Sequence, residues 1–242
     1  TSIIPNTNNY DLIIAADGCN STTQKKLKTP SFRFNYDQIC ITAKVLLSGI
    51  KSNECFEILN KEGPLTVLPL GNDLFQVICS QTIKRGYHNI SLSKSLFLDY
   101  LSTILPYGTQ ADTIIDEIKS YPIKFNLNYS FHSGKYIYLG KTFHAFHPVG
   151  CQGINLCWRD VQSLKNLISS PILKKNKVLI PFIYSISRVV DVLSISLLTD
   201  FLVRYSRSNS NIYFFPRICV LFILKKSMFI RKFILKIMTN GL

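Results

Sequence analysis

The stretch that decides the fold reads DLIIAADGCNS and occupies residues 11–21. Its apolar first half predicts a short buried strand, and Asp17-Gly18 predicts a tight turn at the strand's end. Open α/β sheets bind ligands at the carboxyl ends of their strands, and a glycine there lets the backbone approach a phosphate or a ribityl chain. Taken alone, the pattern also fits an ordinary turn with a surface carboxylate.

A second stretch, GKTFHAFHPVGCQGIN at residues 140–155, precedes a predicted helix. Cys157, Val161, Leu164 and Ile168 recur at helical spacing and predict one apolar stripe along that helix. The free N–H groups and the positive dipole end of a helix N-terminus suit an electron-rich group such as a flavin ring. A plain loop before a core helix would show the same pattern.

The region between the two stretches alternates β-rich segments with turn clusters, which predicts a meander of antiparallel strands. The strand-like segments are residues 34–47, 54–59, 65–70 and 75–81. Helices are expected at 91–105 and 113–120, followed by strands at 124–131 and 135–139.

The 242-residue chain has a formal net charge of +14, and the excess lies in its C-terminal third. Residues 161–242 carry 13 of the 28 basic side chains but only 2 of the 14 acidic ones. An apolar content of 47% permits a core and excludes wholesale disorder. The seven cysteines form no CxxC pair, which argues against a disulfide framework and a zinc site. No apolar run approaches the ~20 residues of a membrane span, so none is expected.

The end of the chain predicts a basic amphipathic helix. Ile230, Phe233, Ile234 and Ile237 share one face, and three lysines fall on the other. Such a helix suits an anionic membrane surface, and packing on its own domain is the alternative. Nucleic acid is not an expected partner, because no recognition motif accompanies the basic residues.

The order of the two stretches around a β meander resembles the flavin-dependent aromatic-ring monooxygenases of the para-hydroxybenzoate hydroxylase type. The likeness is closest to the ubiquinone-biosynthesis hydroxylases, which act on polyprenylated phenols. It is also carried by EGPLTVLPL at 62–70, NLCWRDV at 155–161, TDFL at 199–202 and the late Arg217.

This resemblance implies an α/β fold: the C-terminal part of a Rossmann-like FAD-binding domain with an inserted antiparallel β-sheet substrate domain and a helical C-terminal tail. The implied segments are 1–31 and 134–172 for FAD binding, 32–133 for the substrate sheet and 173–242 for the basic tail. It implies FAD as cofactor, NAD(P)H as co-substrate, and hydroxylation of a polyprenylphenol by a flavin hydroperoxide.

The resemblance also assigns the cofactor-binding residues. Asp17 and Gly18 would approach the FAD linker, and Gly140 would lie by the ribityl–phosphate region. The residues that would line the flavin ring are Pro148, Gly153, Ile154 and Asn155. Because the cofactor does the chemistry, we expect no catalytic acid, base or nucleophile from the chain.

No metal ligand is expected either. His144 and His147 lack a third ligand at metal spacing, so hydrogen bonding within the loop is the favoured role.

Several positions depart from the family pattern. The nucleotide-binding GxGxxG is absent, Lys141 replaces an Asp or Asn, and Cys151 and Cys157 replace glycines. The chain begins without Met, so we expect a piece of a longer protein. Its expected partners are the N-terminal half or other ubiquinone-biosynthesis proteins.

We expect the protein in the cytoplasm, peripheral to the inner membrane. The alternative function is an inactive remnant or a membrane-surface scaffold subunit of a biosynthetic complex. A related flavin reductase or halogenase is a third option, disfavoured by the stretches at 62–70 and 199–202.

Overall fold

The structure, a computed structural model, describes residues 9–207 together with 222, 226–230, 232 and 236. Arg217 and the tail positions Phe233, Ile234 and Ile237 lie outside the described residues, so the amphipathic tail stays a prediction.

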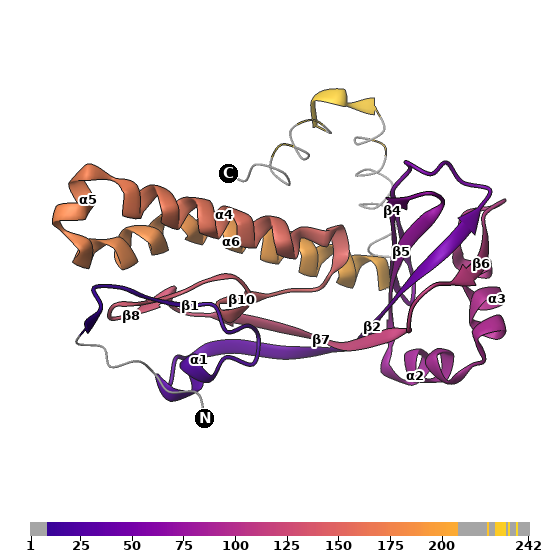
Figure 1. The fold of residues 1–242 in the computed structure, drawn as a ribbon, viewed down its shortest axis with the longest axis horizontal. Helices are drawn as coiled ribbons and strands as arrows, with labels where there is room; N and C mark the ends of the chain where they lie inside the picture. The colour runs from indigo at the N-terminus through magenta and orange to yellow at the C-terminus, as the bar shows by residue number, and fades with distance from the viewer. Residues whose placement is uncertain (1–8, 208–221, 223–225, 231, 233–235, 237–242) are drawn as a thin grey trace.

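The larger sheet has seven antiparallel strands; part of it, with β4, β5 and β6, forms one end of the molecule, and β2, β7 and β10 extend from there beside the helical layer (Figure 1). Its order is β10-β7-β2-β5-β4-β3, with β6 paired to β2 off this path. The strands are β2 (Ser31–Ser48), β3 (Phe56–Asn60), β4 (Gly63–Gly71), β5 (Leu74–Thr82), β6 (Gln110–Ile114), β7 (Lys119–Asn128) and β10 (His144–Ala145). The predicted antiparallel strands are therefore confirmed, but only β3, β4 and β5 form a meander, because β2 pairs with β5 and not with β3. Its β4–β5 turn is made by Asn72 and Asp73, whose positive φ angles of 51° and 57° match a tight hairpin turn.

Two helices cover this sheet, α2 (Ile83–Ser91) and α3 (Lys94–Ile104). The predicted helix at 91–105 is confirmed as α3, which begins where the Ser93 side chain accepts a hydrogen bond from the Leu96 amide. Phe97 and Leu101 of α3 pack into the apolar core of the sheet. The helix predicted at 113–120 is wrong, because Ile114 pairs with β2 and is buried in the same core.

A second, three-stranded sheet contains the Asp-Gly motif. It consists of β1 (Ile13–Ala15), β9 (Tyr136–Tyr138) and β8 (His132–Ser133), in the order β1-β9-β8. β1 and β9 are parallel, with Ala15 opposite Tyr138. The short helix α1 (Thr22–Lys26) follows the motif. This parallel pair beside an antiparallel sheet makes the fold α/β, as expected.

A layer of helices lies beside the small sheet, and in it α4 (Gln152–Ser169) and α6 (Ile180–Arg207) run side by side (Figure 1). They are joined by α5 (Pro171–Lys175) and the 3₁₀ turn η4 (Lys177–Leu179). Two further 3₁₀ turns, η2 (Gly140–Thr142) and η3 (Val149–Cys151), precede α4.

The buried line of α4 differs from the predicted stripe. Its buried residues are Gln152, Leu156, Asp160 and Leu164, whereas Val161 is exposed. The buried face of α4 includes the charged residue Asp160, because its carboxylate is paired with the buried side chains of His144 and Arg188. A hydropathy pattern cannot predict such pairing.

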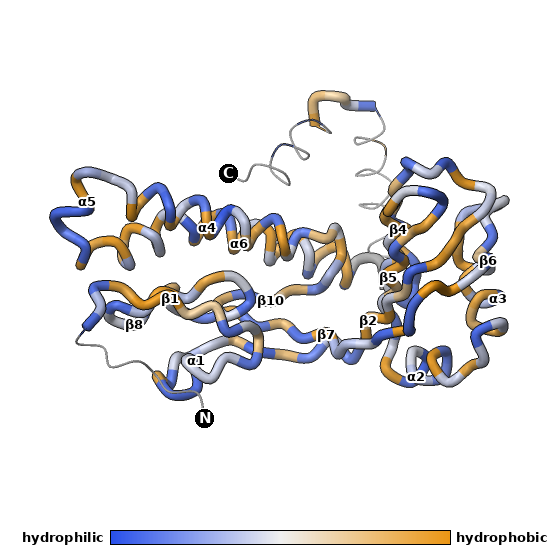
Figure 2. Tube along the Cα trace, in the orientation of Figure 1, coloured by the Kyte–Doolittle hydropathy of each residue, from blue (hydrophilic) through white to orange (hydrophobic). Residues whose placement is uncertain are grey.

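The segment Lys177–Arg204 is long and apolar enough to cross a membrane, by length and composition alone (Figure 2). An 18-residue window within it has a mean hydropathy of 1.8, which corrects the expectation that no run reaches such a length. A core helix passes the same test, and Arg188 and Asp191 of this helix are buried. Asp200, from the TDFL stretch, accepts a hydrogen bond from the Tyr36 hydroxyl of β2 at 3.1 Å, which ties α6 to the large sheet.

Candidate functional site

The structure brings the two sequence motifs into contact through Thr142. The Gly18 amide donates to Thr142 Oγ1 at 2.8 Å, and Thr142 Oγ1 donates to Asp17 Oδ1 at 3.2 Å. The contact follows from the parallel pairing of β1 with β9, because parallel strands end at the same edge of a sheet. Asp17 and Gly18 thus lie beside η2, the turn that begins at Gly140.

The second oxygen of Asp17 faces helix α1. Asp17 Oδ2 accepts from Thr22 Oγ1 at 3.2 Å and from the Thr23 amide at 3.0 Å. Burial alone would raise the pKa of Asp17, but hydrogen bonds from Ser21 and Thr23 outweigh it and hold the pKa well below its usual range. Asp17 is therefore an ionised acceptor bound to its own chain.

A polar group supports the main chain at Thr142, and sequence reasoning did not find it. The carbonyl of Thr142 accepts from the side-chain amides of Gln24 and Asn128. The Arg33 guanidinium donates two hydrogen bonds, from Nη2 to Gln24 Oε1 at 3.0 Å and from Nε to Asn126 Oδ1 at 2.8 Å. The cluster ties α1, β2, β7 and η2 together.

Gly140 is held by a buried charge on α4. Its φ of 58° lies in the left-handed region that favours glycine, and its amide donates to Asp160 Oδ2 at 3.2 Å. The same oxygen lies 2.7 Å from Nε2 of His144, and Asp160 Oδ1 accepts from Arg188 Nε at 2.9 Å. Asp160 is 1% exposed.

The charge network extends along α6 and back to α4. Arg188 Nη1 lies 2.7 Å from Asp191 Oδ2, and Arg159 Nη1 lies 3.1 Å from Asp191 Oδ1. Burial alone would lower the pKa of Arg188, but Asp160 and Asp191 outweigh it and raise the pKa. The sequence shows one sign of this network: Arg188 and Asp191 interrupt the otherwise apolar helix α6.

Both histidines make hydrogen bonds, but only His147 makes one within the loop, because His144 is bound to Asp160 of α4. His147 Nδ1 accepts from the Val149 amide at 3.2 Å, so its Nε2 carries the proton and donates to Gln38 Oε1 at 3.2 Å. Among the residues that the structure describes, no three His, Cys, Asp or Glu side chains gather as a metal site would require.

The entrance to α4 is open. No side-chain hydrogen bond from the described part of the chain caps its N-terminus, where Cys151 takes a left-handed φ of 49°. Gly153 and Ile154 in the first turn are exposed, Asn155 is half-buried, and Pro148 precedes η3. The Gly150 amide donates to the carboxylate of Glu57 on β3, at 2.9 and 3.1 Å.

Most of the site has the open backbone that FAD requires. A Cβ added to Gly18 or Gly153 would meet no described atom within 4 Å, so both backbones are open to a bound group. The uncapped turn of α4 offers donors to an electron-rich edge. Lys141 cannot accept from a hydroxyl, and a Cβ on Gly140 would meet the sulfur of Cys157 at 2.9 Å. The open backbone at Gly18 and Gly153 and the N-terminus of α4 therefore fit FAD. Lys141 does not fit it, because its side chain cannot accept a hydrogen bond from a ribityl hydroxyl.

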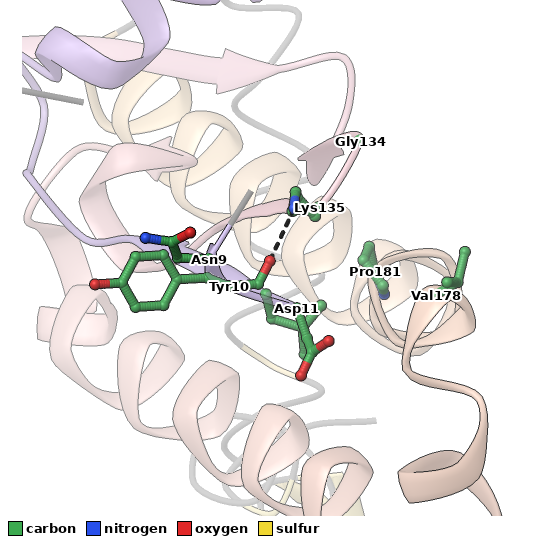
Figure 3. A pocket seen from close by; sticks show the side chains of 8 residues that line it. Asn9, Tyr10, Asp11, Gly134, Lys135, Val178 and Pro181 are labelled. Carbon is green, nitrogen blue, oxygen red and sulfur yellow. Dashed lines mark hydrogen bonds between the residues drawn. The ribbon is translucent and has the colours of Figure 1, made fainter. Parts of the chain in front are cut away.

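A pocket of about 400 Å³ lies elsewhere (Figure 3). Tyr10, Asp11, Lys135 and Pro181 contribute to its lining, and Lys135 Nζ donates to the Tyr10 carbonyl at 2.8 Å. It sits at the amino ends of β1 and β9. Parallel sheets bind their ligands at the carboxyl ends, so this pocket is not the predicted site.

Comparison with known proteins agrees with the two motifs. The model of the FAD binding domain family FAD_binding_3 matches residues 7–177. The chain belongs to the FAD-binding domain family.

Two kinds of relative extend this result. The ubiquinone biosynthesis monooxygenase COQ6 of Dictyostelium discoideum is 24% identical over 205 residues, which covers 66% of this chain and 41% of that protein. The p-nitrophenol 4-monooxygenase PnpA of Pseudomonas putida shares the fold, with a TM-score of 0.74 at 16% identity over 95% of this chain and 59% of that one.

The probable FAD-dependent monooxygenase pqsL of Pseudomonas aeruginosa has a TM-score of 0.67 at 16% identity, over 82% of this chain and 57% of that one. At such identity these structures show the fold alone. The chain spans about two fifths of the length of the COQ6 relative.

Proposed function

We propose that this chain is the C-terminal portion of a flavin-dependent monooxygenase that hydroxylates a polyprenylated phenol in ubiquinone biosynthesis. FAD would be its cofactor and NAD(P)H its co-substrate. The observation that carries the proposal is the joining of the Asp-Gly turn to the Gly140 turn through Thr142. The family match and the COQ6 relatives support it.

Each part of the site has a role in holding the cofactor. The open backbone at Gly18 would approach the FAD linker, and the turn at Gly140 would lie by the ribityl–phosphate region. The uncapped amides of Gly153 and Ile154 would donate to the electron-rich edge of the ring, and Pro148 and Asn155 would line it. Bound FAD supplies the oxygen-dependent redox chemistry. The chain orients the ring and keeps water out.

The large sheet would form the wall of the substrate pocket. Gln38 of β2 is hydrogen-bonded to His147, and Glu57 of β3 binds the amide of Gly150. The sheet and the loop at residues 140–155 therefore form one connected unit. That connection would keep a substrate beside the sheet at a constant position relative to the ring.

The proposal includes two partners. A nucleotide-binding unit with GxGxxG would supply the cradle for the adenine, ribose and pyrophosphate of FAD, which this chain does not contain. A polyprenyl substrate partitions into lipid, so we place the protein in the cytoplasm at the periphery of the inner membrane. The basic C-terminal tail would contribute to that attachment.

Flavin absorbance tests the proposal. We would co-express residues 1–242 with the N-terminal part of the Dictyostelium COQ6 relative and purify the complex. We expect a yellow complex whose flavin is retained on gel filtration. A colourless complex of the two folded parts would contradict the proposal.

Matched glycine variants show whether the flavin uses the Asp-Gly turn. Gly18→Ala and Gly108→Ala carry the same backbone strain, because φ is 81° and 85° and both sites are open. We expect similar losses of stability from the two variants, but a loss of bound flavin only from Gly18→Ala. Equal flavin retention by both variants would exclude Gly18 from the binding site.

A second candidate is a scaffold subunit that binds no flavin. It is supported by Lys141 and by the Asp17 carboxylate, both of whose oxygens are bound by the chain itself. Lys141→Asp restores the acceptor of the family pattern, and Lys141→Met removes the charge alone. A flavoenzyme should retain more flavin with Lys141→Asp than with Lys141→Met, whereas a scaffold should retain none with either.

A further inference from the structure

The segment that joins α4 to α6, residues 171–179, forms an exposed end of the helical layer, which we name the α5 tip (Figure 1). Leu173 is its only buried residue. Ile172 is 79% exposed and Val178 is 86% exposed, far more than aliphatic side chains in a closed fold. The tip therefore presents bulky apolar groups to its surroundings.

The α5 tip also contains basic side chains. Lys174, Lys175 and Lys177 all lie within it, and residues 171–179 contain no Asp or Glu. Lys177 Nζ lies 2.6 Å from Asp11 Oδ2, at the start of the small sheet. This ion pair helps to hold the tip against the sheet beside the pocket of Figure 3, which Val178 also lines.

An exposed apolar stripe on α6 continues from the α5 tip. Phe182, Ile186 and Val190 are spaced four residues apart and are all more than half exposed. The other side of α6 carries Tyr184 and Arg188, which are buried against α4. The helix thus has a packed face and a bare apolar face that begins at the tip.

We propose that the α5 tip docks onto an anionic lipid bilayer. Ile172 and Val178 would enter the boundary of the acyl chains, and Lys174 and Lys175 would lie at the level of the lipid phosphates. The inference rests on the membrane location given in the proposed function, but it does not depend on flavin binding and concerns a different segment from the C-terminal tail.

Charge complementarity and shape favour lipid over a protein partner. Each lysine near an anionic membrane surface contributes roughly 1 kcal/mol of attraction. Asp11 neutralises Lys177, and Lys174 and Lys175 supply the attraction, since residues 171–179 contain no Asp or Glu. A projecting tip needs a concave partner if that partner is a rigid protein, whereas a bilayer interface adapts to it.

Vesicle flotation of the full chain tests the proposal, with phosphatidylcholine vesicles and with vesicles that also contain phosphatidylglycerol. The tip variants are Ile172→Ser/Val178→Ser and Lys174→Gln/Lys175→Gln. We expect each pair to weaken binding to the anionic vesicles at least tenfold, and the wild-type chain to bind the neutral vesicles weakly. Unchanged binding by both tip variants would overturn the proposal.

Matched controls carry the same substitutions at the other end of the molecule. Ile83→Ser/Ile115→Ser removes two exposed aliphatic side chains, and Lys61→Gln/Lys84→Gln removes two exposed lysines. We expect both controls to bind as the wild type does. If the control variants lose as much vesicle binding as the tip variants do, net charge and overall hydrophobicity alone attract the protein to the vesicles. That result would overturn docking by the tip.

A depth measurement separates the α5 tip from the C-terminal tail. The chain has a single tryptophan, Trp158, about 16 Å of helix from the end of α4 at Ser169. In a Trp158→Phe background, the Val178→Trp variant should be quenched by brominated lipids, and the wild-type Trp158 should not. Quenching of Trp158 without quenching of a tryptophan at position 178 would overturn the proposal. It would indicate that another surface, such as the C-terminal tail, contacts the lipid, or that the protein self-associates.

Discussion

The two halves of the loop at residues 140–155 are held in opposite ways. The first half, residues 140–144, is fastened to the core by Asp160 and by the polar group around Thr142. The second half, residues 148–155, enters α4 without a side-chain cap among the described residues, and Ile154 is 66% exposed. The difference teaches that one loop can combine a fixed turn with free backbone donors, and the proposed flavin site needs both, because only the free donors would meet the ligand.

The largest effect should come from breaking the fixed half at its buried charge. Asp160→Ala leaves Arg188 and His144 without their shared carboxylate, and removing one partner of a buried ion pair costs about 3–5 kcal/mol. Urea unfolding followed by circular dichroism measures the loss. Asp112→Ala, at an exposed carboxylate, is the control and should change stability by less than about 0.5 kcal/mol. A loss below about 1 kcal/mol for Asp160→Ala would show that the network contributes little.

A smaller effect should come from Thr142. Thr142→Val removes the acceptor of the Gly18 amide and the donor to Asp17, and leaving such groups unsatisfied costs about 1–3 kcal/mol. Thr142→Ser keeps the hydroxyl and should recover most of that stability. If the valine and serine variants unfold at the same urea concentration, the hydroxyl does not join the two motifs.

The charge of Asp17 should appear in the pH dependence of stability. Its pKa is lowered in the folded state, so its contribution is fully present above the unfolded value of about 3.9 and is lost as the pH falls further. The stability difference between wild type and Asp17→Asn should therefore shrink from pH 6 to pH 3. We expect it to be smaller than the effect of Thr142→Val, because solvent screens this carboxylate. A difference independent of pH would contradict a lowered pKa.

The smallest effect should come from the open half. Glu57→Gln weakens the acceptor of the Gly150 amide at an exposed position, so we expect a loss of about 0.5 kcal/mol or less. Hydrogen exchange should become faster at Gly150 and stay unchanged at Gly140. Equal acceleration at both amides would show that the loop moves as one body, which would remove the contrast between its halves.

The sequence predicted much of this site, and its failures have physical causes. The turn at Asp17-Gly18 and the loop from Gly140 were found because glycine and an abrupt end of hydropathy are local signals. The roles of Asp160 and Arg188 were missed, because their partners are distant along the chain and a buried ion pair looks like a break in an apolar pattern. The helix predicted at 113–120 failed because pairing with β2 outweighed a local helical pattern.

The sequence by itself determined the family of this protein, the antiparallel strands and the two motifs that point to a flavin, whereas the pairing of β2 with β5 came from the tertiary structure. Each rests on local chemistry: glycine at a turn, alternation along a strand, apolar spacing along a helix. Only the tertiary structure decided that Thr142 joins the motifs, that Asp160 anchors the turn at Gly140, and that Ile172 and Val178 protrude beside lysines. Those facts depend on contacts between segments that are distant in the sequence. Such contacts decide which charged side chains are buried in pairs and which apolar side chains remain exposed.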